Sequence, residues 1–276
     1  MSDQTPGEAA PGPVPPEFEV VGDEDRDGVL VRDIRVVPGG AGDPVEAYLV
    51  EPSIVDARVS RPALLFAHWF DTEAPNGNRT QFVDEAVEWA RRHHVAAILP
   101  QLTFPWQGDP TGSTADRERV TAEVNRLRRC LDVVTSRPVI DPARIGVVGH
   151  DFGAMHAALL ATADRRPTAY ALIAAVPRWA DWFLAFWAIE EDRIDYLAAM
   201  RPVDPIEHIG RAAPAKLLLQ FARCDFFIAP MTGLEFKRAA GEGGELKAYE
   251  AEHDMAVPDA LADRTAFLER ALAPAG

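Results

Sequence analysis

Six short apolar runs alternate with helical patterns along most of this 276-residue chain. The runs occupy residues 63–68, 95–100, 144–150, 169–176, 215–222 and 245–250. Helical periodicity separates or follows them near residues 80–94, 116–136, 152–164, 231–240 and 258–272. Strands buried on both faces are continuous apolar runs, and parallel strands need long, usually helical, connections. The order therefore predicts an α/β protein with a mostly parallel sheet and helices on both faces.

The N-terminal part of the chain has a different composition. Residues 1–17 are rich in Pro, Gly, Ala and acidic residues, so they bury too little apolar surface to offset the entropy of ordering, and we expect a flexible tail. Residues 28–37 and 44–52 are β-rich runs on either side of a glycine-rich turn, which predicts an antiparallel pair at a sheet edge. With the six apolar runs, this pair gives about eight expected strands. We expect them all to belong to one domain that spans residues 18–276.

The formal net charge of −15 argues against a nucleic-acid or anionic-membrane partner, because those surfaces attract clustered Lys and Arg. No run of apolar residues is long enough to span a bilayer, and the first residues lack the pattern of a signal peptide. We therefore expect a cytoplasmic protein with no membrane partner.

The histidines outside the motif described below show no spacing typical of a metal site, so we expect no metal and no cofactor. These residues are His93, His94, His150, His156 and His208. The expected partner is a small-molecule substrate, and a homodimer is an open alternative.

Residues 178–213, between two of the expected strands, form a largely helical insertion rich in aromatic residues. Trp179, Trp182 and Trp187 recur at spacings that most often indicate a buried helix face. A lid over an active site and an oligomer contact are the alternatives.

The segment 144–154 passes from an apolar strand directly into a helix through a G-x-D-x-G pattern centred on Asp151. A side chain on such a sharp turn is presented to a site from a strained backbone, and the flanking Gly149 and Gly153 allow close packing. The alternative is that the glycines serve packing alone and that Asp151 caps the helix.

Two further residues follow in the order that this elbow requires. Asp225 comes just after the strand at 215–222, and His253 lies between the last strand and the last helix. The order of nucleophile, acid and histidine predicts that Asp225 orients His253 beside Asp151. Taken singly, Asp225 could be a turn residue and His253 a solvated one.

Backbone NH groups for an oxyanion or leaving group are expected from the loop after residues 63–68 and from the helix start. The candidates are Trp69, Phe70 and Phe152. His68 is expected to brace that loop. We also predict that a substrate pocket is bordered by His68, Trp179, Trp182 and Trp187.

These residues resemble the α/β-hydrolase superfamily over about residues 25–274. Residues 141–161 (DPARIGVVGHDFGAMHAALLA) and the lack of a large insertion resemble its dienelactone-hydrolase-like, cap-poor branch. The pentapeptide G-H-D-F-G instead resembles haloalkane dehalogenases and epoxide hydrolases, which have aspartate at the elbow. Those enzymes generally have His-Gly-x-Pro at the oxyanion loop, where this chain has His68-Trp69-Phe70-Asp71.

An ionised carboxylate needs no base to act as a nucleophile. Its attack on an ester gives a mixed anhydride, an uphill exchange, whereas attack on a carbon bearing halide or on an epoxide gives an ordinary ester. The first hypothesis is therefore a hydrolase that forms an alkyl ester on Asp151, which water activated by His253 then cleaves. The alternatives are an ester or lactone hydrolase with Asp151 as base, and a non-catalytic protein.

Overall fold

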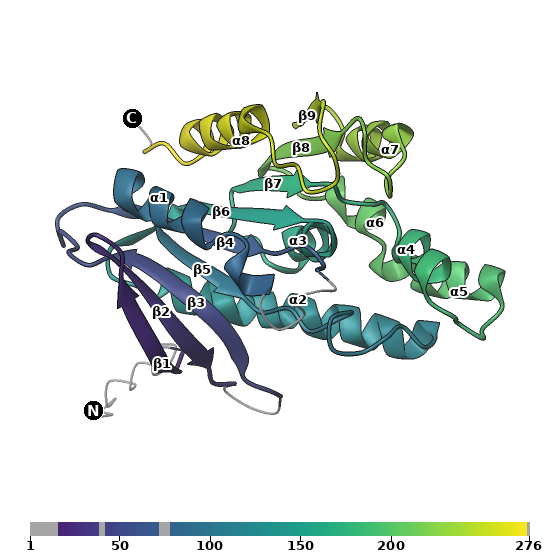
Figure 1. Ribbon diagram of the computed structural model, residues 1–276, viewed down its shortest axis with the longest axis horizontal. Coiled ribbons are helices and arrows are strands. Elements are labelled where there is room, and N and C mark those ends of the chain that lie inside the picture. Colours follow the sequence, from purple (N-terminus) through teal and green to yellow (C-terminus); the bar gives the residue numbers. More distant parts are fainter. Residues whose placement is uncertain (1–15, 39–41, 72–77, 275–276) are drawn as a thin grey trace, which may run out of the picture.

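A computed structural model of the chain describes residues 16–38, 42–71 and 78–274. Within these residues nine strands form one sheet, in the order β1-β2-β3-β5-β4-β6-β7-β8-β9 (Figure 1). The strands are β1 Phe18–Asp25, β2 Val29–Val36, β3 Val45–Pro52, β4 Arg61–Ala67, β5 Ala96–Pro100, β6 Ile140–His150, β7 Ala169–Ile173, β8 Lys216–Ala222 and β9 Gly244–Tyr249. From β5 to β9 all neighbours are parallel, so the mostly parallel sheet is confirmed.

The N-terminal edge of the sheet is antiparallel. β2 pairs with β3 as expected, and β3 pairs with β5. The ninth strand, β1, was not expected, because its sequence FEVVGDED is acidic and its side chains are almost all exposed. Backbone pairing with β2 holds this strand in place rather than burial. Most of the expected tail, residues 1–15, lies outside the described residues.

Helices cover both faces of the sheet (Figure 1). An ion pair between Arg264 and Glu85 joins α1 to α8 on one face, and α2 packs against α3 on the other. The α-helices are α1 Val83–His93, α2 Ser113–Thr135, α3 Phe152–Ala163, α4 Trp179–Phe186, α5 Arg193–Met200, α6 Pro205–Ile209, α7 Pro230–Ala240 and α8 Pro258–Ala271. None of the helices described is both long and apolar enough to cross a membrane.

The core is centred on the strands that lead to the expected site. Every residue of β4, β5 and β7 is buried. In α3, every residue from Phe152 to Ala161 is buried as well, because this alanine-rich helix packs on the sheet, α2 and α6 at once. The helix that begins at Asp151 is therefore one of the most enclosed elements of the molecule.

The aromatic insertion folds as α4, α5, the short 3-10 turn η2 (Arg201–Val203) and α6. Trp179 and Phe183 are completely buried, so one face of α4 belongs to the core. Tyr196 of α5 donates its hydroxyl hydrogen to Asp116 of α2 at 2.8 Å, which anchors the insertion to the body of the domain.

Candidate active site

Asp151 occupies a sharp turn between β6 and α3. Its φ of 54° and ψ of −121° lie in a region that residues other than glycine rarely adopt. A Cβ at Gly153 would lie 2.2 Å from the carbonyl oxygen of Ala67, and one at Gly149 would lie 2.7 Å from the Cα of Ala154. Both glycines are therefore needed for the strand and helix to approach this closely. The Asp151 side chain makes no capping hydrogen bond to α3, so helix capping does not explain it.

The loops after β8 and β9 bring two more residues to Asp151. Nδ1 of His253 lies 2.9 Å from Oδ2 of Asp225, and Nε2 of His253 lies 4.0 Å from Oδ2 of Asp151. Oδ1 of Asp225 accepts hydrogen bonds from the backbone NH groups of Phe227 and Ile228 at 2.8 and 3.0 Å. The three residues that the sequence singled out thus form a contiguous triad, with a fixed carboxylate behind the imidazole.

The pKa values of the two carboxyl groups in this triad are shifted in opposite directions. Burial is the largest influence on Asp151 and raises its pKa to about 6, against the opposing effects of His253 and the NH groups of Phe70 and Phe152. Burial also raises the pKa of Asp225, but hydrogen bonds from His253 and from backbone NH groups outweigh it, and the net shift is downward. Asp225 is thus held ionised, whereas Asp151 titrates close to neutrality.

The surroundings of His253 favour its protonated form. Burial lowers its pKa, but the hydrogen bond to Asp225 and the charge of Asp151 more than compensate, so the pKa is raised overall. An imidazole between two carboxylates is suited to hold and release a proton near neutral pH.

The expected backbone donors face the Asp151 carboxylate. The NH of Phe70 donates to Oδ2 at 3.2 Å, and the NH of Phe152 is close enough to lower the pKa of this carboxyl. The NH of Trp69, the other candidate in that loop, instead donates to Gln81 at 3.0 Å. Oδ1 of Asp151 is buried and has no hydrogen-bond partner among the described residues. One oxygen is therefore fixed, and the other has no partner.

The predicted tryptophans differ in their distances from the rings of Phe152 and His253. The ring of Trp182 lies 5.5 Å from that of Phe152 and 6.0 Å from that of His253. Trp187 lies 6.4 Å from Phe152, and Trp179 stacks behind Phe152 at 6.1 Å. Of the three, only Trp182 contacts the ring of His253 in the structure described.

The three tryptophans also differ in the hydrogen-bond partners of their indole NH groups. Nε1 of Trp187 donates to Asp109 at 3.0 Å, and Nε1 of Trp179 donates to the carbonyl oxygen of Val203 at 2.7 Å. Nε1 of Trp182 is buried with no hydrogen-bond partner within the described residues. Trp182 is therefore the one of these three tryptophans whose indole NH has no partner among the described residues.

His68 braces the oxyanion loop, as expected. It is buried, its Nδ1 lies 3.1 Å from the carbonyl oxygen of Trp69, and its Nε2 accepts a hydrogen bond from the NH of Leu102 at 2.9 Å. Burial is the main cause that lowers its pKa to about 3. Because both of its ring nitrogens are engaged, His68 is a neutral scaffold residue. It was predicted to border the substrate pocket, but its ring packs on Trp106, which in turn packs on Phe70, so His68 lies behind these two aromatic residues.

Three residues of the site were not predicted. Nε2 of His150 donates to the carbonyl oxygen of His253 at 2.9 Å and so fixes the histidine loop. Phe227 packs on the His253 ring at 5.2 Å, and Trp106 packs between His68 and Phe152. His150 could have been inferred from its position beside the elbow, since a side chain there must face the neighbouring loops. Phe227 and Trp106 lie on loops whose path the sequence does not specify.

In the part of the chain that the structure describes, no group of three or more His, Cys, Asp or Glu residues is arranged to hold a metal ion.

Comparison with known proteins identifies the architecture. No family model matches this sequence. An acetyl xylan esterase from Paenibacillus sp. R4 is similar in structure with a TM-score of 0.71 and 18% identity, over 95% of this chain and 90% of that one. Acetyl xylan esterase 1 from Thermoanaerobacterium sp. JW/SL YS485 has a TM-score of 0.65 and 13% identity, over 93% and 88% of the two chains.

A protein from Klebsiella pneumoniae assigned as a dienelactone hydrolase has a TM-score of 0.60 and 17% identity, over 83% of this chain and 94% of that one. None of these three similar structures is a haloalkane dehalogenase or an epoxide hydrolase, so that part of the resemblance gains no support from them. At these identities the similarity concerns the fold, and this chain has the α/β-hydrolase fold predicted from its strand order and elbow.

Proposed function

We propose that this protein hydrolyses carboxylic esters or lactones, with Asp151 as the base that activates water. The observation that carries the proposal is the state of Asp151: its buried Oδ1 has no hydrogen-bond partner among the described residues, and burial raises the pKa of the carboxyl to about 6. A general base works best when its pKa lies near the working pH. The esterase and dienelactone-hydrolase names of the similar structures favour this function over the dehalogenase or epoxide-hydrolase hypothesis.

The reaction uses the triad as a paired base and acid. Water bound at the Asp151 carboxylate gives a proton to it as the water oxygen attacks the ester carbonyl carbon. Protonated His253, oriented by Asp225, gives a proton to the departing alkoxide. A second water, bridging the 4.0 Å between Oδ2 of Asp151 and Nε2 of His253, then relays a proton from Asp151 to His253, which restores the starting state with one ester bond and one water consumed.

The carbonyl oxygen of the substrate needs a donor other than the backbone pair. The NH of Phe70 already donates to the carboxylate of Asp151, and the NH of Phe152 faces the same carboxyl. The buried indole NH of Trp182, beside His253 and Phe152, supplies that donor. An aromatic wall with one NH suits an uncharged acyl or lactone group.

A second function is favoured by a different observation. Phe70 fixes one oxygen of Asp151 and leaves the other without a partner, which is also the arrangement that a carboxylate needs to attack saturated carbon. The donors would then stabilise the oxyanion formed when water cleaves the alkyl ester on Asp151. His253 would act as a base in that scheme rather than as an acid.

A single turnover in ¹⁸O-labelled water separates the two mechanisms. Purified protein is first tested on aryl esters, lactones, epoxides and haloalkanes, and the best substrate is used with enzyme in excess. The base mechanism places the label in the product and none in the peptide that contains Asp151. Label in Asp151 on the first turnover would overturn the base mechanism in favour of the alkyl-enzyme one.

The variants that accompany this assay test whether the site is catalytic. Asp151→Asn should abolish turnover in either mechanism. Asp254→Asn is the matched control, because Asp254 neighbours His253 in sequence but its carboxylate accepts a hydrogen bond from Ala256. Equal activity in both variants and the unchanged protein would show that the reaction belongs elsewhere or that the preparation is contaminated.

A further inference from the structure

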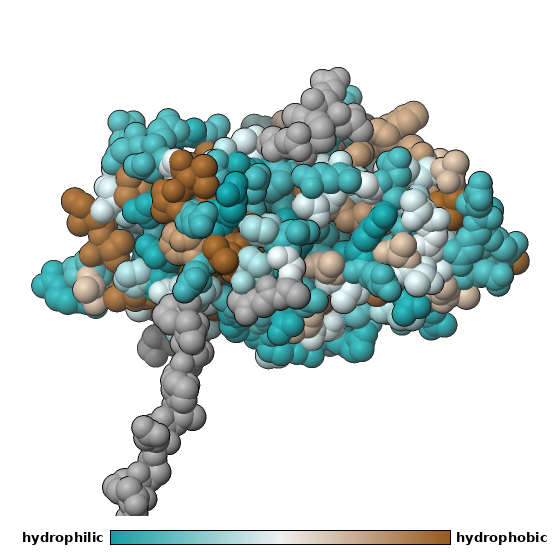
Figure 2. All heavy atoms as spheres, turned by 90° about the horizontal axis from the view of Figure 1, so that it is seen from below, coloured by the Kyte–Doolittle hydropathy of each residue, from teal (hydrophilic) through white to brown (hydrophobic). Residues whose placement is uncertain are grey.

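A large hollow lies over α2, away from the catalytic triad. Its volume is about 1140 Å³, and it is lined by the loop at 42–46, the segment 101–108, α2 and Arg166. We call it the α2 hollow. None of Asp151, Asp225 and His253 lines it. Figure 2 views the molecule from below, the direction in which α2 lies in Figure 1, and hydrophilic side chains cover much of the surface seen from there.

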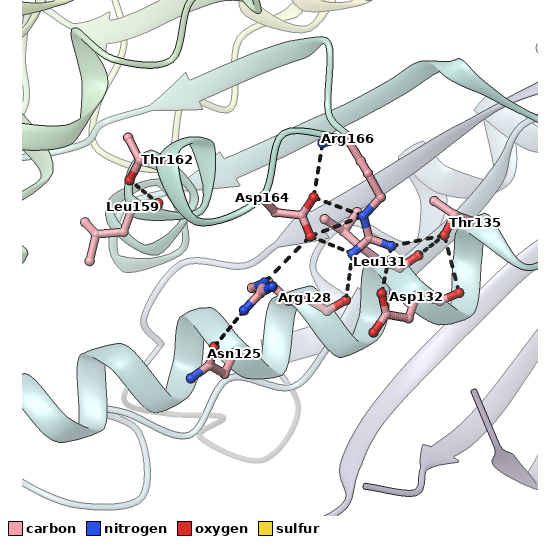
Figure 3. A network of polar contacts seen from close by, with 9 residues as sticks. All are labelled: Asn125, Arg128, Leu131, Asp132, Thr135, Leu159, Thr162, Asp164 and Arg166. Atoms are coloured by element: carbon pink, nitrogen blue, oxygen red, sulfur yellow. Dashed lines mark hydrogen bonds and ion pairs between the residues drawn. The ribbon is translucent and has the colours of Figure 1, made fainter. Parts of the chain in front are cut away.

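Basic side chains slightly outnumber acidic ones in the lining of the α2 hollow, which includes Asp43, Glu46, Glu123 and Asp132, although the net charge of the protein is −15. Five arginines line it: Arg119, Arg126, Arg128, Arg129 and Arg166. At one end two of them are neutralised, as Figure 3 shows. Arg166 pairs with Asp132 at 2.7 Å and with Asp164 at 2.5 Å, and Arg128 lies 3.8 Å from Asp164. Both arginines at that end, Arg166 and Arg128, are therefore paired with carboxylates of the protein.

Arg129 and Arg126 are bound much less completely. Among the described residues Arg129 has no hydrogen-bond or ion-pair partner, although its Nε is buried. Arg126 is 9% exposed, and its NH groups make only long contacts, at 3.5 Å, to the carbonyl oxygens of Pro44 and Gln101. Its Nε also makes no hydrogen bond and lies 3.4 Å from Oε1 of Glu123. Two adjacent guanidinium groups thus have buried donors to spare.

Glu123 completes this cluster. It is 1% exposed, Thr103 hydrogen-bonds to its Oε1, and its Oε2 is buried without a partner in the described structure. Burial is the largest influence on this carboxyl and raises its pKa, which favours the neutral form despite the nearby arginines. A neutral Glu123 would not repel an anion and has a hydroxyl to donate.

We propose that the α2 hollow binds a small oxyanion, a phosphate or carboxylate group, between Arg126 and Arg129. Buried polar atoms nearly always have partners, and three residues that line the same hollow each have a buried polar atom without one among the described residues, so their side chains have unused hydrogen-bonding capacity beside it. Guanidinium groups match the oxygens of carboxylate and phosphate with two hydrogen bonds.

Calorimetric titration with inorganic phosphate and, separately, with citrate tests this site, with sodium chloride at matched ionic strength as the salt control. Saturable binding of either anion is expected, and the comparison tells phosphate from carboxylate recognition. Arg129→Gln should weaken binding by about tenfold or more, because it removes a charge-assisted contact. Arg117→Gln is the matched control, since Arg117 is exposed on the same helix and does not line the hollow.

Two results would overturn the proposal: no saturable binding of either anion, or equal weakening by Arg129→Gln and Arg117→Gln. Thermal unfolding of each variant without ligand checks that it is folded. The Asp151→Asn variant should bind the anion as tightly as the unchanged protein, because the triad lies outside the α2 hollow. Loss of binding in that variant would instead assign the anion to the catalytic site.

Discussion

Replacing Asp151 with Asn should stabilise the folded protein while it removes activity. The pKa of this carboxyl rises from its ordinary 3.8 to about 6, mainly through burial. The ionised side chain therefore favours the unfolded state. The penalty is complete above about pH 6, shrinks as the pH falls towards 3.8 and disappears below it. At 1.36 kcal/mol for each pKa unit, the penalty near pH 8 is about 3 kcal/mol.

Asn is nearly the same size and keeps an oxygen for the NH of Phe70, so the change removes the charge with little repacking. Near pH 8 we expect Asp151→Asn to be more stable by about 2 to 3 kcal/mol, and near pH 5 by about half as much. The matched control is Asp225→Asn, because the pKa of Asp225 is lowered rather than raised. Its ionised form stabilises the fold above the ordinary pKa, so its removal should destabilise the protein.

The assay is urea unfolding followed by tryptophan fluorescence, for three proteins at both pH values. A stabilisation of Asp151→Asn that is the same near pH 5 and pH 8 would refute the electrostatic explanation. So would destabilisation of Asp151→Asn near pH 8, or two substitutions that shift stability in the same direction.

Three further outcomes follow from the site. Gly153→Ala should lower the free energy of unfolding by about 3 kcal/mol or more, measured by urea unfolding, because its Cβ would lie 2.2 Å from a backbone oxygen; a neutral effect would contradict the close approach. Trp182→Phe should lower kcat by about 10²-fold, whereas Trp187→Phe, whose indole NH is already bonded to a surface aspartate, should change it little. The pH profile of kcat/KM should fall below about pH 6, as Asp151 is protonated, and fall again above the raised pKa of His253. A plateau at high pH would indicate that His253 acts as a base.

The sequence was sufficient for the parts of the fold that depend on burial and chain order. The elbow at Asp151 was predictable because only glycine fits at the flanking positions, and the order of Asp225 and His253 follows from the order of the strands. β1 was not predictable, since its side chains are exposed and its conformation depends on backbone pairing with β2.

Side-chain partners were harder to predict than positions. Whether Trp69 or Phe70 donates to the elbow depends on Gln81, which occupies the NH of Trp69 from a neighbouring segment. The distinction between Trp182 and its neighbours depends likewise on Asp109 and on the carbonyl oxygen of Val203, which bind the other two indole groups. Such contacts join residues far apart in sequence, and no periodicity or spacing records them.

The aspartate at this elbow affects what the rest of the site must supply under the proposed function. Oδ2 of Asp151 accepts the hydrogen bond of the Phe70 NH, so this NH is not open to a substrate oxygen. In the ester hydrolase proposed above, the substrate carbonyl oxygen would therefore need another donor, and the ring of Trp182, whose indole NH has no partner among the described residues, lies 6.0 Å from that of His253. Because α4 carries Trp182, and Tyr196 of α5 anchors the insertion to α2, the rigidity of the insertion controls the position of that donor. Under that proposal, the aromatic insertion positions the donor that the aspartate at the elbow makes necessary.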